Sequence, residues 1–586
     1  MTMKEILNEF DRLDKKNFDE TDVSLFLKSF IPEDKNSIGD ELKAELMAFD
    51  FSENYRDTKT GWGTYFGPMV VWNNEDGTST ESPSIKLITP SMLNYWEKRA
   101  KESNNPILKS RYSGLVWDFN NKIAGNNPTH EICRIYIIAL VEIANGDFHK
   151  YEVNTFSKLK RALSLATSIN DNELIEKVKN AVISFEQRHS KDNQPGLWGY
   201  SFDLLLGNKK IILTAAEEKK IIDELEEKLN RLTNADTEQQ KIDPWASEAA
   251  AERLAIYYRK QNKHEDVNRV ILEVGKAYNK IIGDASAMQA SGWLGHLHKF
   301  YLKFNLKTEA EELLLRIREL GPKVALELKP ITHSFELPKE KLEEYISYMT
   351  IGSPEEIILR VAIQYIPIKE KVKEQIFDLS KKAPFTFLVS QKIQDEKGRV
   401  VATIGSLEHD LEGHVVRQVS QNLSFSALFL RAVLKDSFKN KGLSKSHILD
   451  FLKKSPVFNL DRLPIIDRAL DAYFQCDYLT FIHLIIPQIE EAIRSIVEIA
   501  GGNVLKPSRG GGYHLKTFDE ILRDDIIKES LGVDFADYFR ILFTDQRGWN
   551  LRNNVCHGLA SPNLFNPQTS DRIIHALICL GLIHET

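Results

Sequence analysis

Helix-start signals recur along this chain, and they limit what it can fold into. At Thr89, Asp243 and Ser353, a side chain that can cap a helix stands directly before a proline. Proline suits the first helical position because its missing N–H would have no partner there, while the preceding side-chain oxygen accepts a hydrogen bond from a free amide of the first turn. We therefore predict a mainly α-helical fold.

The spacing of apolar residues supports the same prediction. Between residues 217 and 232, Ile221, Leu225, Leu229 and Leu232 recur on one helical face, and charged residues alternate on the other. This pattern is typical of an amphipathic helix on the surface of a core. The charged residues there belong to a solvated face and need no functional explanation.

Signals for strands are confined to two stretches. Residues 61–82 place aromatic and β-branched residues before an Asp76-Gly77 turn, and residues 384–405 alternate apolar and polar residues on both sides of Lys397-Gly398. Each pattern predicts a small β-hairpin, because such dipeptides favour tight turns between paired strands.

The length of 586 residues exceeds what one hydrophobic core can support, since single cores stop growing near ~250 to 300 residues. We predict four segments. They are an N-terminal helical domain with a hairpin (1–125), a solenoid-like region of helix pairs (126–375), a connecting segment with a hairpin and helices (376–460), and a helical bundle at the end (461–586).

Two stretches of the second segment align with each other at an offset of 43 residues. Tyr258 then superposes on Tyr301, and Asn262 on Asn305. A period in the range of ~34 to 47 residues is typical of stacked helix-pair repeats. Two unrelated amphipathic hairpins with similar core residues would explain the alignment equally well.

The charge and the cysteines exclude several classes of protein. A net charge of −7 means that any contact with nucleic acid must come from a local basic surface. No stretch reaches the ~18 apolar residues of a membrane span, and the first residues lack the apolar core of a secretion signal, so we expect a cytoplasmic protein. The four cysteines show no Cys-x-x-Cys spacing, and we expect reduced thiols and no metal or cofactor.

The segment from Arg552 to Gly558, RNNVCHG, contains the two side chains that RNA cleavage needs. Arginine offers a charged fork for phosphate, and histidine exchanges a proton near neutral pH. On a helix, residues five apart differ by about 140° in direction and about 7.5 Å in rise. Arg552 and His557 would therefore converge at a helix start or across the two-fold axis of a dimer.

At this motif the chain resembles the HEPN superfamily of helical ribonucleases. The resemblance rests on IIPQIEEAIRSIVEIAGG at residues 485–502 and GWNLRNNVCHGLASP at residues 548–562, and it covers roughly the last quarter of the chain. Together with residues 95–119, these blocks are similar to an uncharacterised family of long bacterial proteins that end in a HEPN-like domain.

The resemblance implies a function and a set of site residues. Arg552 would contact the phosphate, Asn553 would help to orient the site, and His557 would transfer protons, with Glu490 and Arg494 as supporting polar residues. Proteins of this superfamily usually act as homodimers without a metal, and many serve in toxin or anti-phage defence systems. We therefore expect a metal-independent endoribonuclease that uses the RNA 2′-OH as its nucleophile.

Structural roles for the same residues remain open. Arg552 could pair with Asp545 or Glu490 inside the bundle while His557 caps a helix, and the superfamily includes members without catalytic activity. The protein would then be a helical scaffold that dimerises through its HEPN-like domain and binds a protein partner.

Two further groups of residues have open assignments. The glycine-rich connector with Lys506, Arg509 and His514 could bind RNA phosphate or be a solvated linker. An aromatic and basic cluster could stack on RNA bases, although aromatic residues at helical spacing are more often core. This cluster comprises Tyr95, Trp96, Lys98, Arg99, Lys109, Arg111, Tyr112 and Trp117.

Overall fold

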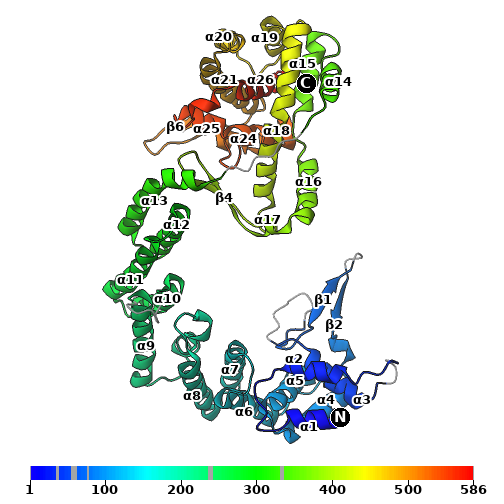
Figure 1. Cartoon of the computed structure of the whole chain (residues 1–586), viewed down its shortest axis with the longest axis vertical. Coiled ribbons are helices and arrows are strands. Elements are labelled where there is room, and N and C mark those ends of the chain that lie inside the picture. The colour runs from blue at the N-terminus through cyan, green and yellow to red at the C-terminus, as the bar shows by residue number, and fades with distance from the viewer. Residues whose placement is uncertain are drawn as a thin grey trace. The chain divides into compact units, whose positions relative to one another are not determined.

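The computed structural model describes residues 2–34, 38–53, 62–74, 78–234, 242–329 and 336–584. These residues form mainly α-helices, with three antiparallel sheets of two strands each (Figure 1). The prediction of a mainly α-helical fold with small hairpins is confirmed. The chain divides into two compact units, the N-terminal unit (1–314) and the C-terminal unit (315–586).

The N-terminal unit consists of short helices, one hairpin and then a succession of long helices. Its elements are α1 (Met3–Phe10), α2 (Glu20–Lys28), α3 (Asp40–Asp50), β1 (Val70–Asn73), β2 (Ser79–Ser82), α4 (Pro90–Glu102), α5 (Pro106–Ala124), α6 (His130–Gly146), α7 (Glu152–Ser168), α8 (Asn172–His189), α9 (Ala215–Thr233), α10 (Pro244–Lys260), α11 (His264–Ile282) and α12 (Ala287–Lys303). Helix α13 (Lys307–Glu327) continues into the second unit.

The helix-start signals act as the sequence predicts. The hydroxyl of Thr89 accepts from the Met92 amide at the start of α4, and the Asp243 carboxylate accepts from the Ala246 amide at the start of α10. Full capping boxes stand at Thr214 and Ser353. Each cap satisfies an amide that the first turn of a helix leaves free.

The aromatic and basic cluster around α4 and α5 belongs largely to the core. Trp96 and Tyr112 are fully buried, and Arg111 is 1% exposed. Helix α5 packs against α4 and α6, and Trp96 and Tyr112 belong to the hydrophobic core of the N-terminal unit. Stacking of RNA bases on these two rings is incompatible with their burial.

Five ionisable residues form a buried network beside this core, which we call the Lys158 cluster: Glu20, Glu53, Arg111, His149 and Lys158. The Lys158 ammonium lies 2.7 Å from a Glu20 oxygen and 2.8 Å from a Glu53 oxygen. Arg111 Nη1 donates to Glu53 at 3.1 Å. Although burial opposes it, the neighbouring Lys158 and His149 hold the pKa of Glu20 well below its ordinary value.

Replacing Lys158 with methionine is expected to lower the free energy of unfolding by about 3 to 5 kcal/mol, because two carboxylates then stay buried without their shared cation. Since the pKa of Glu20 is lowered in the folded protein, its stabilising contribution is present above its ordinary pKa and is lost as the pH falls. The deficit of the variant should therefore shrink in acid. Urea denaturation at several pH values measures it, with exposed Lys160→Met on the same helix as the control. Equal stability of the two variants at neutral pH would contradict this account.

The two aligned stretches around Asn262 and Asn305 form the same turn. Both asparagines have a positive φ, 57° and 64°, and each lies two residues after the last residue of its helix, α10 or α12. The amide of Lys263 donates to the carbonyl of Tyr258 at 3.0 Å, and the amide of Leu306 donates to that of Tyr301 at 3.0 Å. Asparagine tolerates this left-handed backbone better than most residues. The aligned positions thus share a backbone conformation as well as their residue types.

Hairpins occur in both predicted stretches, with one correction. Strands β1 and β2 pair with Val70 opposite Ser82, while the Asp76-Gly77 turn lies outside the described residues. Strands β3 (Gln391–Gln394) and β4 (Val400–Ile404) pair on either side of Gly398. The stretch before β3 was expected to be part of this hairpin, but Pro384–Leu388 forms helix α17, because proline suits a helix start better than a strand interior.

The C-terminal unit contains the remaining helices and two of the hairpins. Besides α17, β3 and β4, its elements are α14 (Lys339–Met349), α15 (Pro354–Gln364), α16 (Lys369–Lys382), α18 (Leu411–Asn440), α19 (Lys445–Lys453), α20 (Leu463–Phe474), α21 (Tyr478–Ile499), β5 (Leu505–Pro507), β6 (Tyr513–Leu515), α22 (Phe518–Leu522), α23 (Asp525–Leu531), α24 (Val533–Phe543), α25 (Leu551–Cys556) and α26 (Pro567–Leu580).

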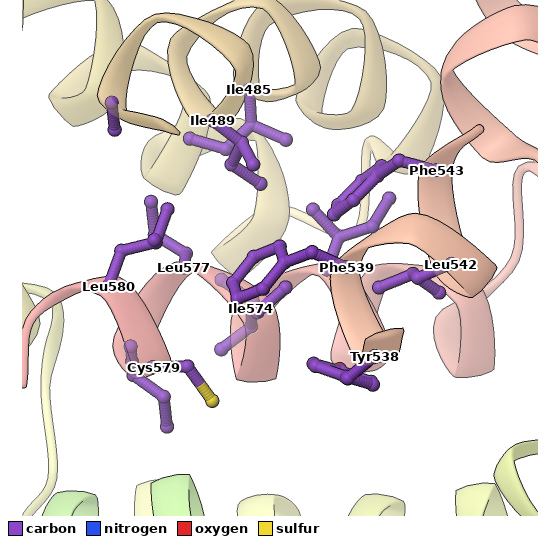
Figure 2. Packing of buried hydrophobic residues seen from close by; sticks show 14 of the residues in the cluster. Ile485, Ile489, Tyr538, Phe539, Leu542, Phe543, Ile574, Leu577, Cys579 and Leu580 are labelled. Carbon is purple, nitrogen blue, oxygen red and sulfur yellow. The ribbon is translucent and has the colours of Figure 1, made fainter. Parts of the chain in front are cut away.

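Helix α26 is the centre of this unit. All its residues from Thr569 to Leu580 are buried, and it packs against α15, α18, α19 and α21. Figure 2 shows side chains from three helices meeting there, among them Ile489 of α21, Phe539 of α24 and Ile574 of α26. The same hydrophobic cluster extends from Met349 to Leu580, so helices that precede residue 461 complete the core of the predicted C-terminal bundle. The boundaries of the four predicted segments stay a prediction.

Two polar side chains on α26, Asp571 and His575, have partners on other helices. Asp571 accepts from Arg431 at 3.1 Å and from the Tyr473 hydroxyl at 2.6 Å. His575 shares a hydrogen bond of 2.7 Å with the Tyr538 hydroxyl. Burial, together with the nearby Arg572 guanidinium, holds the pKa of His575 well below its ordinary value.

His575 should make the C-terminal unit less stable in acid. Its imidazole stays neutral when buried but gains a proton on unfolding below a pH of about 6.5, so the free energy of unfolding should fall by up to about 1.4 kcal/mol per pH unit below that point. Denaturation midpoints between neutral pH and pH ~5 measure this slope. The slope should be smaller in His575→Gln and unchanged in exposed His447→Gln. The same slope in both variants would assign the acid sensitivity to other groups.

Candidate functional site

The predicted catalytic residues lie on and just after helix α25. Leu551 and Val555 are buried and hold the helix against the core, whereas Arg552 and Asn553 are partly exposed. The helix follows Asn550, whose φ of 51° is left-handed, and it ends at His557 before Gly558 with a φ of 65°. Two left-handed residues therefore set the start and the end of this short helix.

Arg552 is fixed by a carboxylate from helix α21. Its Nε donates to a Glu490 oxygen at 2.9 Å, and its side chain remains 25% exposed. Glu490 also accepts from Arg494 Nη2 at 3.1 Å, so one carboxylate bridges two guanidinium groups. The supporting residues predicted from the sequence, Glu490 and Arg494, thus lie at Arg552. Of the two alternative partners for Arg552, Glu490 is the one in contact.

Asn553 is fixed by its amide group. Its Nδ2 donates to the Asn550 side chain at 2.7 Å and to the Thr544 carbonyl at 3.3 Å. The opposite end of the amide, Oδ1, accepts weakly from Arg552 Nη1 at 3.4 Å. This arrangement restrains Asn553 beside the guanidinium. Neither Asn550 nor Thr544 was predicted from the sequence, because their contacts depend on a turn that the residue types do not reveal.

His557 is exposed at the C-terminal end of α25. Its backbone amide donates to the Asn553 carbonyl at 3.1 Å, which makes it the last residue to continue the helical pattern. Within the described parts of the chain, its imidazole has no hydrogen bond or ion pair. His557 therefore caps the helix through its backbone amide, which is one of the roles considered from the sequence, and its ring remains accessible.

Asp545, the other considered partner of Arg552, is engaged elsewhere. It forms ion pairs with Arg540 and with Arg547, the second at 2.8 Å. Despite the opposing effect of burial, hydrogen bonds from Arg547 lower the pKa of Asp545. Asp545 therefore stabilises the turn that precedes α25.

The glycine-rich connector is a hairpin and carries the three possible RNA-binding residues. Lys506 of β5 lies opposite His514 of β6, and Arg509 is in the exposed turn. The Lys506 ammonium lies 2.5 Å from Glu520, and hydrogen bonds from Lys506 and from Thr517 lower the pKa of Glu520 to about 2. Among the described residues, no hydrogen bond or ion pair joins these three side chains to Arg552, Asn553 or His557.

Nowhere in the described ranges do three or more His, Cys, Asp or Glu side chains gather in a way that could hold a metal ion. No helix built from the described residues is both long enough and apolar enough to cross a membrane.

The comparisons with known proteins found no match. Neither a family model, nor a curated protein, nor a solved structure matches this chain. The HEPN resemblance and the roles that it implies therefore stay predictions.

The contact between Glu490 and Arg552 should be measurable as a coupling energy. Because both side chains are partly exposed, a double-mutant cycle of Glu490→Gln and Arg552→Met in urea denaturation is expected to give about 0.5 to 1 kcal/mol. The effects of Glu490→Gln and Arg523→Met should add, since these residues share no contact. A coupling energy of zero for the first pair would mean that Glu490 does not hold Arg552 in solution.

Proposed function

We propose that this protein is a metal-independent endoribonuclease whose site is formed by Arg552, Asn553 and His557, and that two copies of the chain act as a homodimer. The proposal rests on how the side chains of Arg552 and His557 are held. Arg552 is fixed through its Nε, which leaves most of its fork available to a phosphate, and the exposed ring of His557 has no partner among the described residues. The resemblance to helical ribonucleases adds to this support.

The chemistry follows from the RNA itself. The ribose 2′-OH loses its proton to the His557 imidazole and attacks the adjacent phosphorus. Arg552 stabilises the charge that develops on the phosphate oxygens, while the 5′-oxygen leaves with a proton. The products are a 2′,3′-cyclic phosphate and a 5′-hydroxyl end. The nucleophile is part of the substrate, so the reaction does not require an activated water.

A dimer would solve the geometric difficulty of the motif. Arg552 and His557 are five positions apart in the sequence, a spacing at which helical geometry makes two side chains diverge. A two-fold axis near α25 would bring the Arg552 of one copy towards the His557 of the other, so that one histidine accepts the first proton and the second donates the last.

The scaffold alternative is favoured by one observation, the ion pair between Arg552 and Glu490. An arginine that serves only to join α21 and α25 would make the same contact. In that case the bundle would support dimerisation, and the helical region would bind a protein partner.

For the nuclease, we propose a setting in bacterial toxin or anti-phage defence.

Incubation of the purified protein with total RNA in the presence of EDTA tests the proposal. The parent protein is expected to cleave RNA, and both Arg552→Ala and His557→Ala should reduce the rate at least ~100-fold, because each removes a group that acts on the transition state. Mass spectrometry of the fragments should find 2′,3′-cyclic phosphate ends.

Matched controls separate this site from contamination. Arg523→Ala and His447→Ala remove an exposed arginine and an exposed histidine from the same unit and should retain full activity. A DNA strand of the same sequence should stay intact, since it lacks the 2′-OH. Parent protein that leaves RNA intact would favour the scaffold, and unchanged cleavage by His557→Ala would assign the activity to a contaminant or another site.

A further inference from the structure

A polar cavity opens beside the Lys158 cluster in the N-terminal unit, far along the chain from α25. Its volume is about 350 Å³, which lies within the range of ~300 to 1,000 Å³ typical of small-molecule sites. Its walls come from α2, the end of α3, α5 and α7 together with the segments that follow α3. The lining residues include Thr21, Ser52, Tyr65, Asn154 and Ser157 as well as all five members of the cluster.

The cavity has a buried floor and an accessible mouth. On the floor, Lys158 is 2% exposed, and the rings of Phe49 and Phe51 are also almost completely buried. At the mouth, Thr21 and Asn154 are exposed. A ligand could therefore enter from solvent and reach the carboxylates of Glu20 and Glu53, whose side chains are 15% and 22% exposed.

The charges on the floor balance one another. Glu20 and Glu53 are offset by Lys158 and Arg111. His149 Nδ1 accepts from the Tyr151 amide at 3.0 Å, so Nε2 is the ring nitrogen that faces Glu20 as a donor, at 3.3 Å. A charged ligand would leave one buried charge without a counterpart, so the cavity favours a neutral one.

The remaining polar groups suit hydroxyls. Carboxylate oxygens accept more than one hydrogen bond each, so Glu20 retains acceptor capacity beyond its bonds to Lys158 and His149, and Glu53 beyond its bonds to Lys158 and Arg111. The hydroxyl of Tyr65 is buried and has no hydrogen-bond partner among the described residues, which is uncommon for such a group. Paired hydroxyls on a ligand can donate to a carboxylate, as ribose does in nucleotide-binding proteins, and can also accept from Tyr65.

From these observations, we infer that the cavity beside Lys158 binds a small neutral ligand that carries vicinal hydroxyl groups, either a free sugar or the ribose of a nucleoside. The carboxylates of Glu20 and Glu53 accept from the two hydroxyls. This site is independent of the proposed ribonuclease activity, because none of its residues belongs to the C-terminal unit.

Thermal denaturation of the full chain tests the inference with defined probes. Adenosine and uridine represent nucleosides, and ribose and glucose represent free sugars, all at millimolar concentration. At about tenfold excess over the dissociation constant, a bound probe should raise Tm by about 2 to 4 °C. A shift from nucleosides alone would assign the site to them, and a shift from sugars alone would assign it to free sugars.

Two controls show whether a shift arises in this cavity. The 2′,3′-dideoxy form of an active nucleoside, or the deoxy form of an active sugar, should give no shift because it lacks the vicinal hydroxyls. Ser157→Met, which fills the cavity without removing a charge, should abolish the shift. Ser164→Met, on the exposed face of the same helix, should preserve it. Asn154→Leu at the mouth provides a second cavity variant if Ser157→Met does not fold.

Three results would overturn the inference. They are the absence of a shift with every probe, an equal shift with the deoxy compounds, and a shift that persists unchanged in the folded cavity variants.

Discussion

The C-terminal unit depends on the burial of one helix from every side. Helix α26 has no exposed face from Thr569 to Leu580, so each of its polar groups needs a protein partner, and other helices must supply it. Asp571 receives Arg431 from α18 and Tyr473 from α20, and His575 receives Tyr538 from α24. These bonds determine which side of each surrounding helix faces α26. The candidate site on α25 rests on this arrangement, since Leu551 and Val555 anchor α25 to the same core.

A single carboxylate determines how the candidate site presents its arginine. Glu490 lies on α21, a long helix of this core, and it holds the Nε side of Arg552 while its other oxygen holds Arg494. The site therefore combines a restrained guanidinium with the exposed imidazole of His557. A restrained cation loses little entropy when it binds phosphate. A purely structural arginine would make the same contact, so this ion pair agrees with both the nuclease and the scaffold hypothesis.

Both units bury networks of charge. In the C-terminal unit, Arg540 contacts Glu412, Asp537 and Asp545 beside the hydrophobic core. In the N-terminal unit, Lys158, Arg111 and two glutamates form one network that lines a cavity. Such a network is costly to bury and gives little net stability compared with apolar packing. A cluster of this kind beside an accessible cavity is therefore more readily explained by ligand binding than by folding alone.

Much of the local structure could be predicted from the sequence, because helix caps, apolar spacing and left-handed asparagines act over a few residues. The starts of α4, α10 and α15 and the matching turns at Asn262 and Asn305 follow from such local rules. The hairpin at residues 505–515 was missed, since its strands are only three residues long and its glycines also fit an unstructured linker. Helix α17 was assigned to a strand because its alternating residues suggested one.

The sequence by itself determined that the chain is mainly helical, where many helices begin, and which arginine and histidine stand together near its end. Only the tertiary structure decided that Glu490, rather than Asp545, holds Arg552, that the ring of His557 stays exposed, and that Glu20, Glu53 and Lys158 meet around a cavity. These contacts join residues separated by 62 to 138 positions along the chain. Local preferences cannot specify such pairs, because the packing of whole helices sets which side chains come within reach of one another.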